Sequence, residues 1–367
     1  MFKRKVLSAS LWTLVGNAGQ QLISFFLFIY LTRALTVEDF GLMGLAVAFI
    51  DVISLLGRFG QVEALQQRET LSRETASTAF WILLVIGLGS LMAICLLATP
   101  LAHMLHEPRL AGVLLALSPV CLFLNIGQVH EAFVKRELKY QLIARRSVAA
   151  ALVSATTAFL AAYNGLGVYA LVLQRLAYNL VYSGTLLVTY YWRPRLTFDL
   201  REAKDLAVTG LNISASNTIS ILNLRIIDFL VGVFLGVKVL GYLRVAWRFF
   251  DFVSLLVVQP ISSVYLATLS SIQSDAAHVR RAYLRFLQII SCVVIPTFLG
   301  LGSVAPSFVE VVFGTRWLPS VSIFQMLAVA SLSIPIGFLF PPTMIILRRT
   351  DTVRSQAIWQ AVATATL

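Results

Sequence analysis

LTVEDFGLMGLAVAFIDVISLL, residues 35–56, is followed two hundred residues later by a related stretch, LGVKVLGYLRVAWRFFDFVSLL, residues 235–256. Over residues 11–60, twelve positions recur identically at this offset without a gap, and the aspartate Asp51, set in apolar sequence, recurs as Asp251. An internal duplication in so apolar a chain predicts a transporter built from two related lobes, with its binding site where the lobes meet.

The composition is that of an integral membrane protein. Hydrophobic residues make up 58% of the chain and charged residues 13%, and the mean hydropathy is +0.84. The apolar runs can each cross a hydrocarbon core of about 30 Å as a helix, which excludes an outer-membrane β-barrel. We expect an all-α polytopic membrane protein with about 10 to 11 transmembrane helices, the last beginning near Gln356. The complete spans are expected at residues 8–32, 40–62, 76–100, 110–133, 147–164, 167–190, 206–236, 240–269, 284–305 and 321–347.

Positive charge in the loops sets the orientation. Twenty flanking lysines and arginines fall on one side of the expected spans, and four, Arg33, Arg109, Lys238 and Arg316, fall on the other. Because cytoplasmic loops retain Lys and Arg, the N-terminus is expected in the cytoplasm. The net charge of +12 therefore reflects topology, and we expect no nucleic-acid partner.

The loops offer no catalytic chemistry. The longest, roughly residues 131–146 and 270–283, have about fifteen residues each, and the sequence carries no Gly-rich phosphate loop, metal-ligand spacing or nucleophile motif. We therefore expect no enzyme, no cofactor and no metal site.

Charged residues inside the spans are the remaining candidates for function. Each costs roughly 2.5 to 3.5 kcal/mol at a helix centre, so together they should face a polar interior rather than lipid. The set comprises Arg58, Arg175, Arg225, Arg244, Arg248, Asp51, Asp228 and Asp251.

Spacing places several of these charges on common helix faces. Arg244, Arg248 and Asp251 follow one another at i, i+4 and i+7, and Arg175 shares one side of its helix with Tyr178 and Tyr182. A simpler interpretation is structural pairing, since Arg225 with Asp228 and Arg248 with Asp251 stand three residues apart. Arg58 and Arg244, near span ends, could also extend to the interface.

Five arginines against three aspartates leave a surplus of two positive charges in this set. Such a surplus in a water-filled cavity suits an anionic ligand, particularly a phosphate, to which guanidinium offers a forked set of donors. Tyr178 and Tyr182 could stack on sugar faces, with simple packing as the alternative. We expect the three aspartates to serve ion coupling or charge pairing.

Several motifs resemble the Wzx-type oligosaccharide flippases, the polysaccharide transporters of the MOP superfamily. They are LTRALTVEDFGLMGLA (31–46), STAFW (77–81), FVKRELKY (133–140), GVYALVLQ (167–174) and FGTRWLP (313–319). The resemblance implies two six-helix lobes around a central cavity. It also implies movement of an undecaprenyl-pyrophosphate-linked glycan from the cytoplasmic to the periplasmic leaflet of the bacterial inner membrane.

The resemblance also singles out residues and boundaries. Ala246-Trp247-Arg248 is similar to an Ala-aromatic-Arg pattern of the family's eighth helix, whereas Arg244 and Arg175 match no family signature. We expect an N-terminal lobe at 1–205 and a C-terminal lobe at 206–367, the latter lacking most of its last two helices. A natural short form, a fragment and a truncated form all stay open.

Other functions stay open beside the flippase. They are a cation-coupled multidrug exporter of the same superfamily, a membrane polysaccharide polymerase or glycosyltransferase, and a non-transporting scaffold of a glycan assembly complex. The expected partners are a lipid-linked glycan, the lipid bilayer and other polysaccharide assembly proteins.

Overall fold

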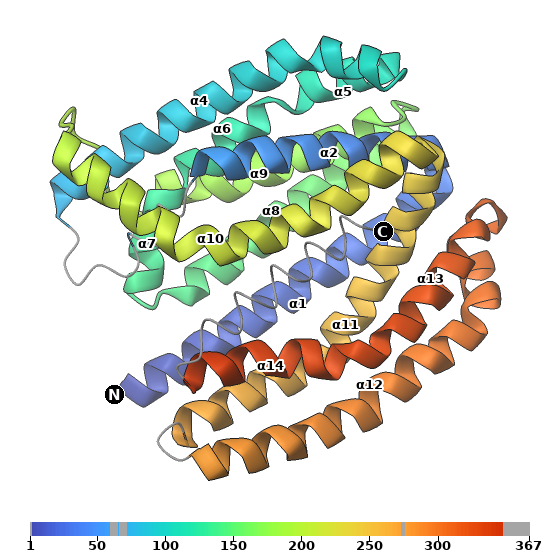
Figure 1. Cartoon of the computed structure of the whole chain (residues 1–367). Helices are drawn as coiled ribbons and strands as arrows, with labels where there is room; N and C mark the ends of the chain where they lie inside the picture. Colours follow the sequence, from blue (N-terminus) through green and yellow to red (C-terminus); the bar gives the residue numbers. More distant parts are fainter. Residues whose placement is uncertain (1, 59–64, 66–71, 273–275, 348–367) are drawn as a thin grey trace. The chain divides into compact units, whose positions relative to one another are not determined.

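A computed structural model describes residues 2–58, 65, 72–272 and 276–347 (Figure 1). Throughout this described part the regular structure is helical, without a strand, which confirms the all-α prediction. The α-helices are α1 (Phe2–Ala34), α2 (Val37–Arg58), α4 (Arg73–Met104), α5 (Pro108–Leu117), α6 (Pro119–Ile126), α7 (Gln128–Arg136), α8 (Tyr140–Tyr163), α9 (Tyr169–Thr189), α10 (Leu200–Leu230), α11 (Val237–Ile272), α12 (Ala276–Val312), α13 (Pro319–Ala330) and α14 (Ile334–Ile346). Short π or 3₁₀ segments are η1 (Val231–Leu235), η2 (Thr315–Trp317) and η3 (Ser331–Ser333).

Each of the ten complete spans expected from the sequence lies mainly on helix where the structure describes it. Within the described residues, six helical stretches are long and apolar enough to cross a membrane: Arg73–Met104, Pro108–Arg136, Tyr140–Tyr163, Val237–Leu266, Ala277–Val312 and Pro319–Met344. The chain is thus a multi-pass membrane protein. The number of ten to eleven membrane crossings stays a prediction. The last expected helix, which would begin near Gln356, lies outside the described residues.

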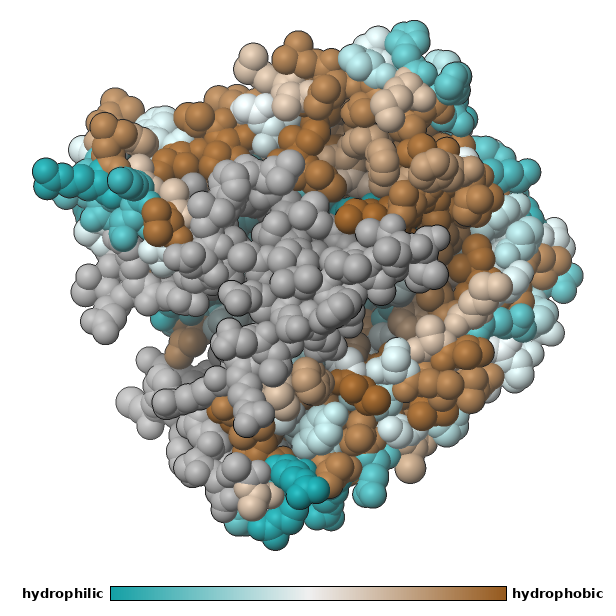
Figure 2. Space-filling view, viewed as in Figure 1, coloured by the Kyte–Doolittle hydropathy of each residue, from teal (hydrophilic) through white to brown (hydrophobic). Residues whose placement is uncertain are grey.

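Helix α4 shows how such a helix meets lipid. Along one stripe Val85, Met92 and Leu96 are 67%, 62% and 73% exposed. The opposite stripe buries small residues such as Gly87 and Ala98 against neighbouring helices. A helix that is apolar on its exposed face is stable only against lipid. Figure 2 shows apolar side chains of this kind over much of the visible surface.

The sequence repeat has a structural counterpart at its start. Helix α2 begins at Val37 and α11 begins at Val237, two hundred residues apart. In the first copy, Thr36 and Asp39 form a reciprocal capping box, in which each backbone N–H donates to the other's side chain at 3.2 Å. In the second copy, Gly236 makes the turn with a φ of 86°, a conformation that favours glycine.

The expected fourth span is broken twice, into α5, α6 and α7. Pro119 has no N–H for the carbonyl of Leu115, and the Ser118 hydroxyl donates to that carbonyl at 2.9 Å. At the second break, the Ser183 hydroxyl of α9 donates to the carbonyl of Phe123 at 2.6 Å. Side chains thus satisfy backbone groups that a broken membrane helix leaves open.

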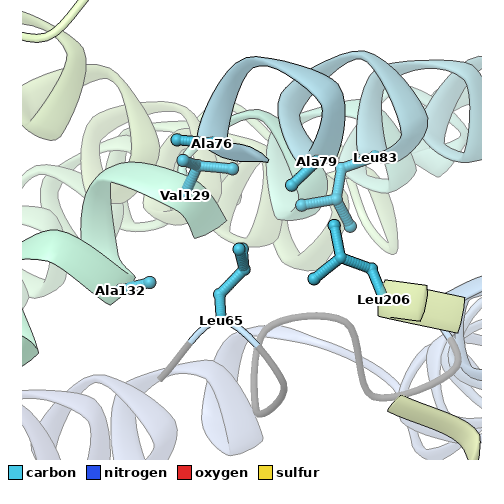
Figure 3. Packing of buried hydrophobic residues seen from close by; sticks show 7 residues of the cluster. All are labelled: Leu65, Ala76, Ala79, Leu83, Val129, Ala132 and Leu206. Carbon is cyan, nitrogen blue, oxygen red and sulfur yellow. The ribbon is translucent and has the colours of Figure 1, made fainter. Parts of the chain in front are cut away.

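The chain divides into two compact units, Met1–Val237 and Lys238–Leu367. Helix α10 packs on α2 and α4, within the first unit. The lobe boundary expected from the sequence, between residues 205 and 206, stays a prediction about the repeat. A fully buried cluster joins α4, α7 and α10 to Leu65, which lies between α2 and α4 in the sequence (Figure 3). Its members are Leu65, Ala76, Ala79, Leu83, Val129, Ala132 and Leu206.

The second unit has an aromatic core. The ring of Phe249 on α11 stacks on Phe308 of α12 at 4.6 Å between centroids and packs on Phe324 of α13 at 4.5 Å. Trp317, from the FGTRWLP motif, is fully buried and meets Tyr242 edge to face. That motif therefore contributes packing within this unit.

Candidate functional site

Asp51 is the centre of an ion-pair network inside the first unit. Its Oδ1 accepts from Nη2 of Arg175 on α9 at 2.9 Å, and its Oδ2 accepts from Nη2 of Arg225 on α10 at 2.7 Å. Nη1 of Arg225 also donates to Oδ2 of Asp228, one turn further along α10, at 3.2 Å. The structure thus brings together half of the charged residues that the sequence singles out.

The network lies among apolar neighbours. On α2, Ile50 is fully buried and Ala48 is 2% exposed. The side chain of Asp51 is 18% exposed, and those of Arg175 and Arg225 are 30% and 25% exposed. Breaking a pair in such surroundings leaves a poorly solvated charge, which costs about 3 to 5 kcal/mol where burial is complete.

Charges within this network balance, since two arginines face two aspartates. The structural pairing of Arg225 with Asp228 that the spacing allowed is present. The surplus of positive charge predicted for the whole set therefore does not reside here. The side chain of Arg58 lies outside the described residues.

A second charged group lies on α11 in the second unit. Arg248 is half-buried, and both Arg248 and Arg244 lie close enough to Asp251 to interact with it electrostatically. Asp251 is exposed in the described part of the chain. Two arginines against one aspartate give this stripe an excess of one positive charge.

Irregular helix borders both groups. The π-helical segment η1 follows Asp228 closely, and it ends where α11 begins. Its Gly232 is buried, and Phe229, just before it, meets Phe49 of α2 edge to face at 5.5 Å. Single π turns are frequent at functional sites, because they change the direction of side chains on either side.

Tyr178 and Tyr182 are stacked on each other, with ring centroids 5.6 Å apart and planes at 15°. The guanidinium of Arg146 lies 3.7 Å from the ring centroid of Tyr182, and the Tyr182 hydroxyl donates to Glu131 at 3.3 Å. Tyr178 hydrogen-bonds with Ser147 and Gln20, so both tyrosines are held by protein groups.

Buried Arg146 and half-buried Glu131 form an ion pair that the sequence did not single out. Nη2 of Arg146, whose side chain is 3% exposed, lies 2.5 Å from Oε2 of Glu131, which also pairs with Lys135. The expected loop at 131–146 is wrong, because α7 continues to Arg136 and α8 begins at Tyr140. The adjacent Arg145 and Arg146 could have indicated a buried charge. Neighbouring residues on a helix point about 100° apart, so the two side chains cannot both face the same surroundings.

A further ion pair, between buried Asp39 and exposed Arg109, lies at the start of α2. Asp39 is 3% exposed, and its Oδ1 accepts from Nη2 of Arg109 at 2.6 Å. Arg109 borders a cavity of about 410 Å³ whose other lining residues are Pro108, Gly112 and residues 165–169. No group of three His, Cys, Asp or Glu side chains in the described residues forms a metal-binding arrangement.

These features together define a polytopic membrane protein with long apolar helices, two of them interrupted in the described residues, and partly buried charge pairs that join three helices. The fold agrees, since 95% of this chain superposes on 78% of the lipid II flippase MurJ in an inward closed conformation, with a TM-score of 0.78 and 13% identity. It also superposes over 97% of its length on 84% of an inward-facing MATE family transporter of the MOP superfamily, with a TM-score of 0.70 and 15% identity.

The chain belongs to the polysaccharide biosynthesis protein family, whose model matches residues 30–322. It is 24% identical over 341 residues to the lipopolysaccharide biosynthesis protein WzxC of Escherichia coli K12, covering 91% of this chain and 68% of the relative. It is 23% identical over 319 residues to the succinoglycan biosynthesis transport protein ExoT of Rhizobium meliloti, covering 87% and 65%. The chain thus spans about two thirds of these relatives, and the predicted family resemblance is confirmed.

Proposed function

We propose that this protein is a flippase that moves a lipid-linked oligosaccharide, an undecaprenyl-pyrophosphate glycan, across the bacterial inner membrane by alternating access. Family membership and the names of WzxC and ExoT support polysaccharide as the cargo. The single observation that carries the proposal is the pair Arg175 and Arg225, held on one carboxylate among apolar helices.

Arginine suits this cargo for a physical reason. A guanidinium group presents planar, forked donors that match two oxygens of a phosphate, and it stays charged at any physiological pH. At the partly buried depth of Arg175 and Arg225, a pyrophosphate is attracted more strongly than in water. The lipid tail stays in the bilayer while the head group passes through the protein.

The remaining residues of the predicted set take supporting roles. Arg244 and Arg248 on α11 offer a second cationic stripe for the head group, and Arg58 completes the predicted cationic set. Asp51, Asp228 and Asp251 act as counter-charges or in ion coupling. Tyr178 stands one turn from Arg175 and meets the first sugar, while Tyr182 holds Tyr178 in place.

The proposed step makes and breaks no covalent bond, so the protein acts as a transporter and not as an enzyme. The charge bias of the loops favours a cytoplasmic N-terminus and delivery to the periplasmic leaflet. Other polysaccharide assembly proteins are proposed as partners, since the transported unit must be made before and polymerised after the step.

A cation-coupled multidrug exporter is the main rival, because a MATE family transporter shares the fold. Fold likeness alone therefore does not decide the cargo. Family membership and paired arginines favour an anionic glycan lipid over a cationic drug. A polymerase, a glycosyltransferase and a scaffold differ from a flippase by producing no translocation.

The test is translocation in reconstituted vesicles. The purified chain is placed in vesicles that carry a fluorescent pyrophosphate-linked glycan lipid, and the fraction protected from a membrane-impermeant quencher is followed with time. We expect wild type to equilibrate the lipid between leaflets, and Arg175→Gln to slow this at least about tenfold, the loss of one charge-assisted contact.

Arg109→Gln is the matched control, since Arg109 is also paired with an aspartate but lies outside the Asp51 network. It should translocate at the wild-type rate. Wild-type vesicles that equilibrate no faster than protein-free vesicles would remove the flippase proposal. Uptake of a cationic dye instead of the glycan lipid would favour the exporter.

A further inference from the structure

The carboxylate of Asp51 occupies the position that an anionic ligand would take between Arg175 and Arg225. Each of its oxygens accepts from a different arginine, Oδ1 from Arg175 and Oδ2 from Arg225. A carboxylate and a phosphate present similar paired oxygens to guanidinium donors. The two arginines are therefore already satisfied in part by a group of the protein itself.

Both arginines nevertheless keep an unused donor. Nε of Arg175 and Nε of Arg225 are buried and have no hydrogen-bond partner in the described part of the chain. Buried donors are usually paired, and orphaned ones mark a strained or ligand-binding arrangement. A single carboxylate has too few oxygens in reach to satisfy both guanidinium forks, whereas a pyrophosphate offers more acceptors and more charge.

We propose that Asp51 is an internal counter-anion, which neutralises the cargo-binding arginines of the empty transporter and is displaced when the pyrophosphate head group binds. This inference rests on the proposed function, because it concerns the same site. It gives Asp51 the role of a competitor: small anions that bind weakly fail to displace it, and only a head group with several acceptor oxygens succeeds.

Displacement also changes how the helices are joined. Asp51 joins α2 to both α9 and α10 through its two ion pairs. Arg225 keeps its second partner, Asp228, on its own helix, so α10 loses only its ion pair to α2 and keeps the Phe49–Phe229 contact. Cargo binding thus removes the ion pairs that hold α2 to α9 and α10, and it joins α9 to α10 through the head group, so occupancy changes the contacts between helices.

Binding of inorganic pyrophosphate to the purified full chain in detergent, measured by isothermal titration calorimetry, tests the competition. Asp51→Asn keeps the side-chain volume and removes the competing charge. It should lower the Kd for pyrophosphate at least about tenfold, a change equivalent to roughly 1.4 kcal/mol. Asp39→Asn, which changes a buried aspartate paired with Arg109 outside the network, should leave the Kd unchanged.

Arg225→Gln reports on the site itself and separates the two ideas. If Arg225→Gln weakens pyrophosphate binding while Asp51→Asn does not strengthen it, the competitor role of Asp51 is wrong and the anion site stands. If neither wild type nor any variant binds pyrophosphate, the anion site of the proposed function fails and the competitor role falls with it.

Asp228→Asn covers the case in which Asp51→Asn does not fold, as judged by gel filtration. Asp228 shares Arg225 with Asp51, so its loss should also strengthen pyrophosphate binding, by a smaller factor. An unchanged or higher Kd in that variant would overturn the competitor role on its own. Translocation provides a further readout, since Asp51→Asn should bind more tightly yet move the glycan lipid more slowly than wild type.

Discussion

Replacing Glu131 with Leu should destabilise the protein more than replacing Arg146 with Met, although the two residues form one ion pair. Glu131→Leu leaves Arg146, whose side chain is 3% exposed, without its carboxylate and beside Lys135. Arg146→Met leaves Glu131 paired with Lys135 at 2.9 Å, and Lys135 is 33% exposed and remains solvated. The two charges that are left behind therefore differ in how well they are compensated.

The magnitudes follow from this difference. Losing one partner of a buried pair costs about 3 to 5 kcal/mol, and we expect Glu131→Leu in that range and Arg146→Met at about 1 to 3 kcal/mol. The double variant should cost less than Glu131→Leu alone, because it leaves no buried charge unpaired; only the solvated Lys135 and the Tyr182 hydroxyl lose their contact with Glu131. The coupling between the two sites should thus be large and of compensating sign.

Equilibrium unfolding in mixed micelles with increasing SDS, followed by tryptophan fluorescence, measures these free energies. Glu137→Gln serves as the surface control, since Glu137 pairs with Lys139 at 40% and 58% exposure and should cost no more than about 1 kcal/mol. Additive effects of the two buried substitutions, or a larger cost for Arg146→Met, would refute the assignment of Lys135 as the second partner.

Ser183→Ala should cost about 1 to 3 kcal/mol in the same unfolding assay, because the Phe123 carbonyl at the helix break loses its donor, and an unchanged midpoint would contradict this. Hydrogen bonds from Lys139 and Tyr190 lower the pKa of Glu137 below its usual 4.5, so its contribution to stability should be present above that pH and fade as the pH falls below it. Glu137→Gln should flatten that acid-side slope in a pH series, and an unaltered slope would assign it elsewhere. Arg248→Ala should abolish glycan export in cells while membrane insertion stays intact, and normal export would remove Arg248 from the proposed site.

The apolar periodicity and the repeat predicted the helices well, because membrane helices need long apolar runs and their length is fixed by the bilayer. The repeat also predicted that α2 and α11 begin at equivalent residues, 37 and 237. The double break in the fourth span was missed. Pro119 and Gly127 are ordinary in membrane helices, and only Ser118 and Ser183 reveal the open carbonyls.

The sequence identified the charged residues inside the spans, but not which of them pair with one another. Helix spacing identified Arg225 with Asp228, which stand one turn apart. The pairing of Asp51 with Arg175 joins residues 124 positions apart, and no local pattern carries that information. Glu131 and Arg146 were expected in a loop, because charged residues near the end of a span are usually solvated. Packing between helices removes most of their side-chain surface from solvent instead.

Helix α12 is longer than a membrane is thick. Its 37 residues at about 1.5 Å each extend about 55 Å, whereas a bilayer with its head groups measures about 40 to 45 Å. The helix must therefore lean, bend at Pro296 or Pro306, or project beyond the lipid. Its exposed Arg280, Arg281 and Arg285 lie near the N-terminal end of the helix, where anionic lipid head groups would be within reach. Membrane thickness and lipid charge should thus act on this helix directly, so the activity of the transporter should depend on the bilayer chosen for reconstitution.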